Sequence, residues 1–444
     1  MVARPIGWID HDLVCLFVGR LLRSFSQAYL VIIVPLYLAR LGYDAIHLGV
    51  LFSIAAAAGA ILAAAIGFLS DRIGRKPLLI TISLMTGAAG GIFATSTGFA
   101  VLTAAAALGT IGRGGGAAGG GGYGPFYPAE QALIAEHAKD ADRTTVFAAL
   151  SLVGLVGGTI GSLVAWLPDL LRQHGLPLLQ GYRVLFAFTV LVGLGMAAAV
   201  LPVREAGLNR ASDHQILSMY TKHGGARSDR RWRLGLSPVA WNLICRFMLT
   251  NATNGLAGGM LGPLLVYWFH RRYGVEATQI GQLYFAINLL AAIADVTASG
   301  ITARIGTVRT VAISRALAAL LLGAMVLMPM FWMAGLLYAL RMIAVSLSVP
   351  VRQSYLMGVI SETERSRAAG LASFPSQLGG SFGPYLGGYM MQHIELGLPL
   401  EAAALLQAIS AVLFYFFFQS IRPPEETATI SIQARSFDAS SAHG

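Results

Sequence analysis

The sequence contains few charged residues and very little cysteine. Of its 444 residues only 12% are charged, about half of the quarter that is usual in soluble globular proteins, whereas 56% are hydrophobic. The two cysteines, Cys15 and Cys245, exclude a disulfide framework. Water is therefore not the main solvent of this chain, and disulfides do not hold it together.

Acidic residues are the scarcer kind of charge, which leaves a net charge of +10. The basic residues lie scattered at the ends of apolar runs and form no single basic face, so we expect no nucleic-acid partner. No cluster of catalytic residues stands out, and the longest polar stretch is too short for a receptor domain. The nine histidines fall in predicted loops, tails or helix ends, so we expect neither an enzyme nor a cofactor or metal site.

Long apolar runs recur through the chain. A bilayer core needs about 20 mostly apolar residues for each helical crossing. The runs predict an all-α integral membrane protein with twelve transmembrane helices, at about residues 13–38, 46–70, 77–97, 101–136, 144–168, 183–203, 239–269, 278–303, 310–333, 334–360, 366–392 and 399–421. The first run carries Arg20 and Arg23 and lacks a cleavage pattern, so we expect it to remain in the mature protein.

A charged stretch divides these spans into two sets of six. We predict an N-terminal six-helix bundle over 1–203, a cytoplasmic central loop over 204–238, a C-terminal six-helix bundle over 239–421 and a cytoplasmic tail over 422–444. Lys and Arg collect in the loops on one side, leaving only a few arginines on the other. Because basic loops are retained in the cytoplasm, both termini are predicted to be cytoplasmic, in the plasma (inner) membrane.

The two halves repeat each other. The segment from Pro128 to Arg143 matches the segment from Pro350 to Arg365 in Pro, Gln and Arg at identical spacing, and Gly158 and Gly161 continue the match at Gly380 and Gly383. A weaker echo pairs Arg40, Gly42, Asp44 and Gly49 with Arg272, Gly274, Glu276 and Gly281. Such a duplication predicts two pseudo-symmetric bundles around a central site.

The loop between the second and third spans carries the most specific motif. It reads Gly67-Phe-Leu-Ser-Asp71-Arg72-Ile-Gly74-Arg75-Lys76, and it resembles the signature of major facilitator superfamily transporters at every defining position. The resemblance implies the fold of that family and a conformational latch on the cytoplasmic side, in which Arg75 pairs with Glu136. The alternative is that Arg72, Arg75 and Lys76 only fix topology. The second half keeps Arg304 and Gly306 but lacks the aspartate.

Two further motifs match the family in part. The eleventh span holds Gly370, Gly379, Gly383-Pro384 and Gly387-Gly388, the spacing of an antiporter signature that normally marks the fifth span. Arg113 lies in a glycine-rich stretch of the fourth span, in the position of a signature of proton-coupled members, but the glutamine is missing. Those glycines fit either close helix packing or a pliant helix.

Charged residues within the spans are candidates for the transport pathway because burying a charge in a membrane is costly. We select Arg113, Glu130, Asp295, Arg341 and Arg352 as cavity or coupling residues. For Arg20, Arg23, Arg246 and Arg315, snorkelling to the interface is an equal alternative. Glu130 and Arg352 occupy equivalent repeat positions, which suggests an inter-half gate; in the alternative, each contacts its own bundle.

The resemblance favours a secondary active transporter working by alternating access, with proton-coupled efflux as the first interpretation. Import of a small organic anion is the second, favoured by the excess of arginines. A receptor or enzyme on the same scaffold is a remote third. We expect a small-molecule substrate that is anionic or zwitterionic, with protons and membrane lipid as further partners, and we expect a monomer.

Overall fold

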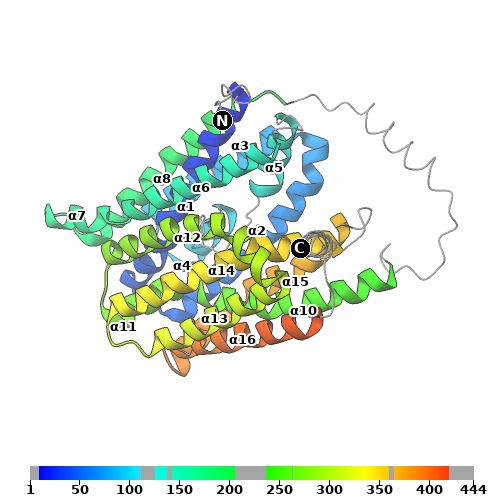
Figure 1. Ribbon diagram of the computed structural model, residues 1–444. Coiled ribbons are helices and arrows are strands. Elements are labelled where there is room, and N and C mark those ends of the chain that lie inside the picture. The colour runs from blue at the N-terminus through cyan, green and yellow to red at the C-terminus, as the bar shows by residue number, and fades with distance from the viewer. Residues whose placement is uncertain are drawn as a thin grey trace, which may run out of the picture. The chain divides into compact units, whose positions relative to one another are not determined.

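The computed structural model describes residues 10–109, 111, 126–137, 143–205, 237–262, 264–359 and 365–419. Within these ranges the regular elements are all α-helices (Figure 1). The first half contains α1 (His11–Arg40), α2 (Ala45–Ile73), α3 (Arg75–Thr95), α4 (Phe99–Gly109), α5 (Phe126–His137), α6 (Arg143–Val164), α7 (Leu167–Gln173) and α8 (Leu178–Val200). The second half contains α10 (Pro238–Leu261), α11 (Leu264–Tyr273), α12 (Ala277–Ile305), α13 (Thr307–Val326), α14 (Phe331–Val359), α15 (Arg365–His393) and α16 (Leu398–Phe418).

Each of the twelve predicted spans coincides with one described helix or with two consecutive ones. Eight segments of the described chain are long and apolar enough to cross a membrane by length and composition alone. The helices also expose large apolar side chains, with Leu191, Leu320 and Phe416 each more than 60% exposed. Such a surface is costly in water and suits lipid. The predicted all-α membrane fold with twelve spans is confirmed.

One predicted span is wrong as a single continuous helix. In place of 239–269, α10 ends at Leu261 and α11 begins at Leu264. Pro263 stands between them in the sequence, and proline lacks the N–H that a continuing helix needs. Hydropathy alone does not register such a break. Of the predicted span 101–136 the structure describes α4 up to Gly109, Ile111 and α5 from Phe126; the rest lies outside the described residues.

The predicted boundary between the ninth and tenth spans is also wrong by several residues. We predicted abutting helices over 310–333 and 334–360, but α13 ends at Val326 and α14 begins at Phe331. Pro329 lies in the connection, where it interrupts the apolar run without lowering its hydropathy much.

Aspartates cap the first two helices. The Asp10 side chain accepts a hydrogen bond from the His11 amide at 2.7 Å, and Asp44 accepts one from the His47 amide at 3.2 Å. Burial raises the pKa of Asp44, but hydrogen bonds from the His47 side chain and amide outweigh it and leave this pKa below its usual value. Both caps satisfy free N–H groups of a first helical turn.

The described chain forms two compact units. The first comprises Met1–Asp229, Gly259–Leu289 and Ser381–Pro399; the second comprises Arg230–Gly258, Leu290–Gly380 and Leu400–Gly444. The first unit therefore contains α1 to α8 together with α11 and one end of α12 and of α15. The two units are defined by how the helices pack, and the first unit contains helices from both halves of the sequence. The predicted division of the sequence at 204–238 therefore stays a prediction.

Repeat-related glycines make the same kind of helix contact in both halves. Side chains added at Gly157 and Gly161 of α6 would overlap the backbone of α1 at Leu21 and Phe25. In the second half, side chains at Gly379 and Gly383 of α15 would overlap the backbone of α10. The internal repeat seen in the sequence thus has a counterpart in helix packing, because only glycine permits so close an approach.

Candidate functional site

The signature loop turns sharply between α2 and α3. Gly74 has a φ of 98°, which is the left-handed region that favours glycine, and the amides of Arg75 and Lys76 follow it. The Glu205 carboxylate accepts hydrogen bonds from these two amides at 2.5 and 3.4 Å. An anion at this place satisfies free N–H groups and opposes the positive end of the helix dipole. Sequence reasoning missed Glu205. The one sequence feature that could have pointed to it is its position as an acidic residue just after the sixth predicted span.

The same turn exists in the second half. Gly306 has a φ of 90° and precedes α13 as Gly74 precedes α3. The backbone of the repeat is therefore retained, although the sequence there has lost the aspartate.

Replacement of Gly74 by alanine is expected to destabilise the turn. A Cβ at this position would lie 2.8 Å from a Glu205 carboxylate oxygen, and alanine disfavours the positive φ by about 1–2 kcal/mol. Thermal unfolding of the purified protein should show a lower transition temperature for Gly74→Ala. Gly91→Ala is the control, because its Cβ would make only ordinary contact with Val190. Equal stability of the two variants would contradict this account of the turn.

The remaining latch residues lie around this turn. The Arg75 guanidinium forms an ion pair with Glu136 of α5, which is the contact that the resemblance implied, and both side chains are about one quarter exposed. Gly67, Asp71 and Arg72 lie in the last turns of α2, but their side chains are outside the described residues. For Lys76 the structure shows the backbone contact with Glu205. The latch role of the whole set stays a prediction.

A buried ion cluster joins α1 to α5. Arg20 Nη1 donates to Glu130 Oε2 at 3.0 Å, and Arg23 Nη1 lies 3.8 Å from the same oxygen. The Glu130 side chain is only 4% exposed, against 24% for Arg20 and 14% for Arg23. The Arg23 guanidinium also lies over the Phe126 ring, 4.6 Å from its centre. These arginines therefore pair with a carboxylate, and sequence reasoning missed the pairing because it joins helices distant in the chain.

Arginines of the second half bond to neutral side chains. Arg341 is buried and donates to Gln407 at 3.3 Å. Arg352, at the repeat position of Glu130, donates to Asn251 of α10. Glu130 and Arg352 thus each bond to the first helix of their own half, which is the alternative to an inter-half gate. The gate itself concerns another conformation and stays a prediction.

A third arginine in this half, Arg315, is also buried. It donates to Ser410 of α16 at 2.8 Å, and its guanidinium lies over the Phe414 ring. Snorkelling does not describe a side chain that is 5% exposed and bonded to a neighbouring helix.

The other cavity candidates are only partly placed. Arg113 lies outside the described residues, and Asp295 lies in α12 with a side chain that is not described. In α15, Gly383 approaches Gly259, while Gly387 and Gly388 approach Met260 and Gly49. A Cβ on Gly49 would in turn meet the Pro384 carbonyl at 2.5 Å. Gly370 is in α15, but its surroundings are not described.

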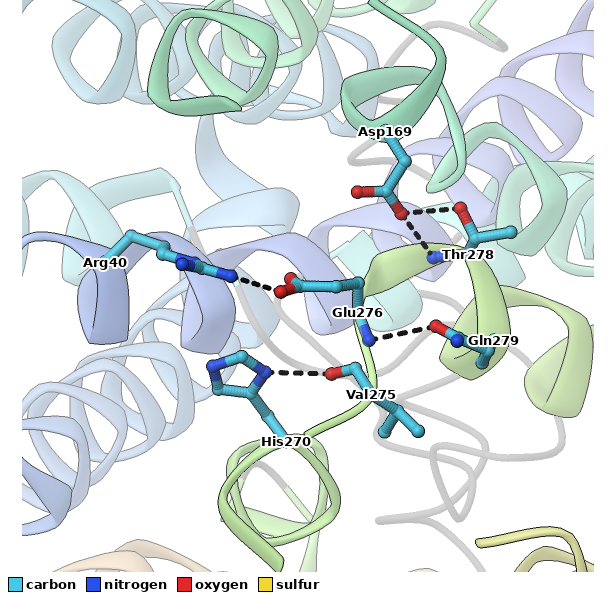
Figure 2. A network of polar contacts seen from close by, with 7 residues as sticks. All are labelled: Arg40, Asp169, His270, Val275, Glu276, Thr278 and Gln279. Atoms are coloured by element: carbon cyan, nitrogen blue, oxygen red, sulfur yellow. Dashed lines mark hydrogen bonds and ion pairs between the residues drawn. The ribbon is translucent and has the colours of Figure 1, made fainter. Parts of the chain in front are cut away.

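A polar network connects the two halves within the first compact unit, as Figure 2 shows. Arg40, at the end of α1, forms an ion pair with Glu276 at the start of α12. Asp169 of α7 accepts hydrogen bonds from the Thr278 amide at 2.9 Å and from its hydroxyl at 2.5 Å. We call Arg40, Asp169, Glu276 and Thr278 the closure network. Arg40 and Glu276 are members of the sequence echo, but no repeat pattern predicts that they pair across the halves.

The loop that carries Glu276 is fixed by local bonds. His270 bonds to the Val275 carbonyl at 2.8 Å, and Gln279 accepts from the Glu276 amide at 2.9 Å (Figure 2). Deeper in the same unit, Asn288 donates to Ser162 at 3.1 Å. The contacts of His270, Gln279 and the closure network lie at the helix ends that the distribution of Lys and Arg assigns to the outside.

Repeated helical halves, paired glycine turns and polar contacts between the halves within the first compact unit fit the architecture of a membrane transporter. The chain belongs to the Major Facilitator Superfamily, whose family model matches residues 16–250 and again residues 247–440. This membership favours a transporter over an enzyme.

The chain is also similar to individual proteins. An uncharacterized membrane protein of Saccharomyces cerevisiae is 22% identical over 414 residues, covering 88% of this chain and 90% of that protein. Among solved structures, a peptide transporter in complex with sulfate has a TM-score of 0.70 and 14% identity, covering 94% of this chain and 96% of its own. A D-xylose–proton symporter has a TM-score of 0.69 and 14% identity, covering 91% and 97%. At these identities the structures show the shared fold.

Proposed function

We propose that this protein is a secondary active transporter that moves a small anionic solute together with protons by alternating access. The observation that carries the proposal is the closure network, because it joins the two halves through a few polar contacts at one end of the helices. Alternating access requires contacts of this kind, which hold one side closed and can be broken.

The signature-loop contacts lie far from the closure network. Arg40 ends α1, whereas the opposite end of α1 contacts the last residue of α5 through Asp12 and His137 at 3.3 Å. Because 28 residues of helix separate Asp12 from Arg40, the two ends are about 42 Å apart. The Arg75–Glu136 pair belongs to the Asp12 end, next to His137. We propose that this latch, with Gly67, Asp71, Arg72, Gly74 and Lys76, stabilises the outward-open state.

Proton coupling is proposed at Glu130. It is a carboxylate buried between helices, and a charged group in that place is a candidate for a functional role by default. The D-xylose–proton symporter, which shares the fold, couples its solute to protons as its name states. Arg113, Asp295, Arg341 and Arg352 are proposed as further residues of the pathway. The plasma (inner) membrane location, cytoplasmic termini and monomeric state are parts of the same proposal.

Proton-coupled efflux is the second candidate. The observation that favours it is the glycine spacing of α15, which matches an antiporter signature. Four of those glycines contact α10, α11 or α2, so close packing already accounts for Gly379, Gly383, Gly387 and Gly388. We therefore place import of an anion first.

The proposed function is tested by proton movement in proteoliposomes of known orientation that contain a pH-sensitive dye. Monocarboxylates, dicarboxylates, phosphate and hydrophobic cations are added outside, one at a time. We expect at least one anion to acidify the lumen in a protein-dependent manner. Alkalinisation by a hydrophobic cation, with no response to any anion, would instead establish proton-coupled exchange and overturn the proposed import.

A further inference from the structure

One face of α1 carries three long polar side chains. Arg20, Arg23 and Gln27 are spaced at i, i+3 and i+7, which places them on the same side of a helix. We call these three residues the α1 arginine face. It meets Glu130 of α5, whose Oε2 lies 3.0 Å from Arg20 and 3.8 Å from Arg23. Two guanidinium groups thus share one carboxylate.

The α1 arginine face has hydrogen-bonding capacity that the described residues do not use. Within the described part of the chain, Arg20 Nε and Gln27 Oε1 are buried and have no hydrogen-bond partner. Gln27 is only 5% exposed. Buried polar atoms are rarely left unsatisfied in folded proteins, so a bound ligand group is a candidate partner for these two atoms. Rotation of the Gln27 amide would present its NH₂ group as a donor at the same place.

The neighbouring helix α6 makes room for this arrangement. A Cβ on Gly154 would lie 2.9 Å from Arg20 Nε and 3.3 Å from the Ser24 hydroxyl. The absence of a side chain at this position lets the Arg20 guanidinium lie between α6 and α5. An arginine in such a place binds carboxylate or phosphate through fixed, paired donors.

We propose that the α1 arginine face binds the oxyanion group of the transported solute, a carboxylate or a phosphate, and that Glu130 competes with this group for the two guanidiniums. A proton that binds to Glu130 removes its charge, so the arginines are released and the anion takes the place of the carboxylate. Deprotonation of Glu130 reverses the exchange. The inference rests on the proposed function and deepens it by naming the substrate group and its site.

Coupling of proton and solute follows from this competition. Because protonation of Glu130 favours the anion, binding of the anion favours protonation by the same factor. The two ligands therefore bind together and leave together, which is the behaviour of a symporter. Exchange of a proton for the solute would require the opposite linkage, in which each ligand expels the other.

Other charged groups contact α5 at a distance from Glu130 along the helix. From α3, Arg75 pairs with Glu136, and from the start of α1, Asp12 contacts His137. These two contacts lie about two turns from Glu130. From α2, the side chains of Asp71 and Arg72 are outside the described residues. Substitution of Glu130 therefore separates its contribution to the pH dependence of anion binding from the contributions of these other groups.

The test measures binding of succinate and of inorganic phosphate to the purified full-length protein at constant ionic strength, at about pH 8 and about pH 5, where a carboxylate begins to take up protons. For the wild type we expect affinity to rise about tenfold or more at the lower pH, within the usual range of coupling between sites. Glu130→Gln, which is always neutral, should bind tightly at both pH values. Glu401→Gln, the same change at an exposed glutamate of α16, should behave as the wild type.

Two further variants separate binding from folding. Arg23→Lys keeps the charge but loses the paired donors, and Gln27→Leu keeps the volume but loses the amide. Each should weaken binding of the anion to the Glu130→Gln protein at least fivefold, while size-exclusion profiles remain unchanged. Phosphatidylglycerol, added in the same titration, should not replace phosphate, because the proposed ligand is a small solute.

Several results would overturn the inference. One is equal pH dependence in the wild type and in Glu130→Gln; another is binding of neither succinate nor phosphate by Glu130→Gln. Saturation by phosphatidylglycerol alone would assign the site to lipid. Coupled uptake in proteoliposomes without linked binding contradicts only this inference, whereas linked binding without proton movement contradicts the proposed function.

Discussion

Replacement of Glu130 by glutamine is expected to abolish proton-driven accumulation of the solute. Electroneutral symport of one proton with one monovalent anion sustains up to about tenfold accumulation for each unit of pH difference. The variant cannot release or bind a proton at this position, so its accumulation ratio should fall to about one. Uptake of labelled solute into proteoliposomes, with and without a pH gradient, measures the ratio.

Exchange of labelled for unlabelled solute is the control in that experiment. Exchange needs the two conformations but no net proton movement, so Glu130→Gln should retain it. Loss of both activities would show that Glu130 holds the fold or the solute and does not couple protons. Asp295→Asn belongs in the same assay, because it is the other acid well inside the spans. Accumulation that survives in Glu130→Gln and disappears in Asp295→Asn would move the coupling site to Asp295.

Breaking the closure network is expected to open the predicted outer side. The Arg40–Glu276 pair is partly exposed, so its loss costs about 0.2–1 kcal/mol, which corresponds to a severalfold shift in population. We expect Arg40→Glu to increase labelling of a Ser162→Cys probe by an impermeant maleimide about fivefold, in a background without Cys15 and Cys245. Ser162 is fully buried in the present conformation, where Asn288 donates to it.

The reciprocal charge exchange tests the pairing itself. Arg40→Glu combined with Glu276→Arg should return labelling close to the starting rate, because the two charges face each other again. Asp169→Ala should raise labelling by a similar factor through loss of the bonds to the Thr278 amide and hydroxyl. Arg172→Ala, an exposed arginine near Asp169, is the control and should have no effect. Additive increases without rescue in the double exchange would mean that the pair does not hold the side closed.

The membrane fold and the internal repeat could be predicted from the sequence because both depend on local patterns of polarity and residue spacing. A span of about 20 apolar residues is a property of one segment, and Pro128 and Pro350 identify the repeat by spacing alone. The signature loop is a local motif too, and it lies where α2 ends and α3 begins, between the second and third predicted spans. The predicted helix boundaries were wrong where a single proline, such as Pro263, interrupts a helix although the hydropathy of the segment stays high.

Partners of the charged residues could not be predicted in the same way. For Arg20 and Arg23 the sequence left snorkelling and a role within the membrane as equal alternatives. Their partner Glu130 is 110 residues from Arg20 in the chain and reaches the two arginines only when α5 packs on α1. Arg40 and Glu276 had been identified as members of an echo, yet the echo matches Arg40 with Arg272, not with Glu276. The carboxylate of Glu205 had no role until α8 brought it to the turn at Gly74.

By itself, the sequence determined that this chain crosses the membrane as helices, that its halves are duplicates and that it resembles a transporter family. Those features depend on side-chain polarity and spacing along one dimension. Only the tertiary structure decided that Glu130 pairs with two arginines and that Arg40 pairs with Glu276. The reason is physical: a buried charge takes the partner that helix packing brings within about 4 Å, and that distance bears no relation to separation along the chain.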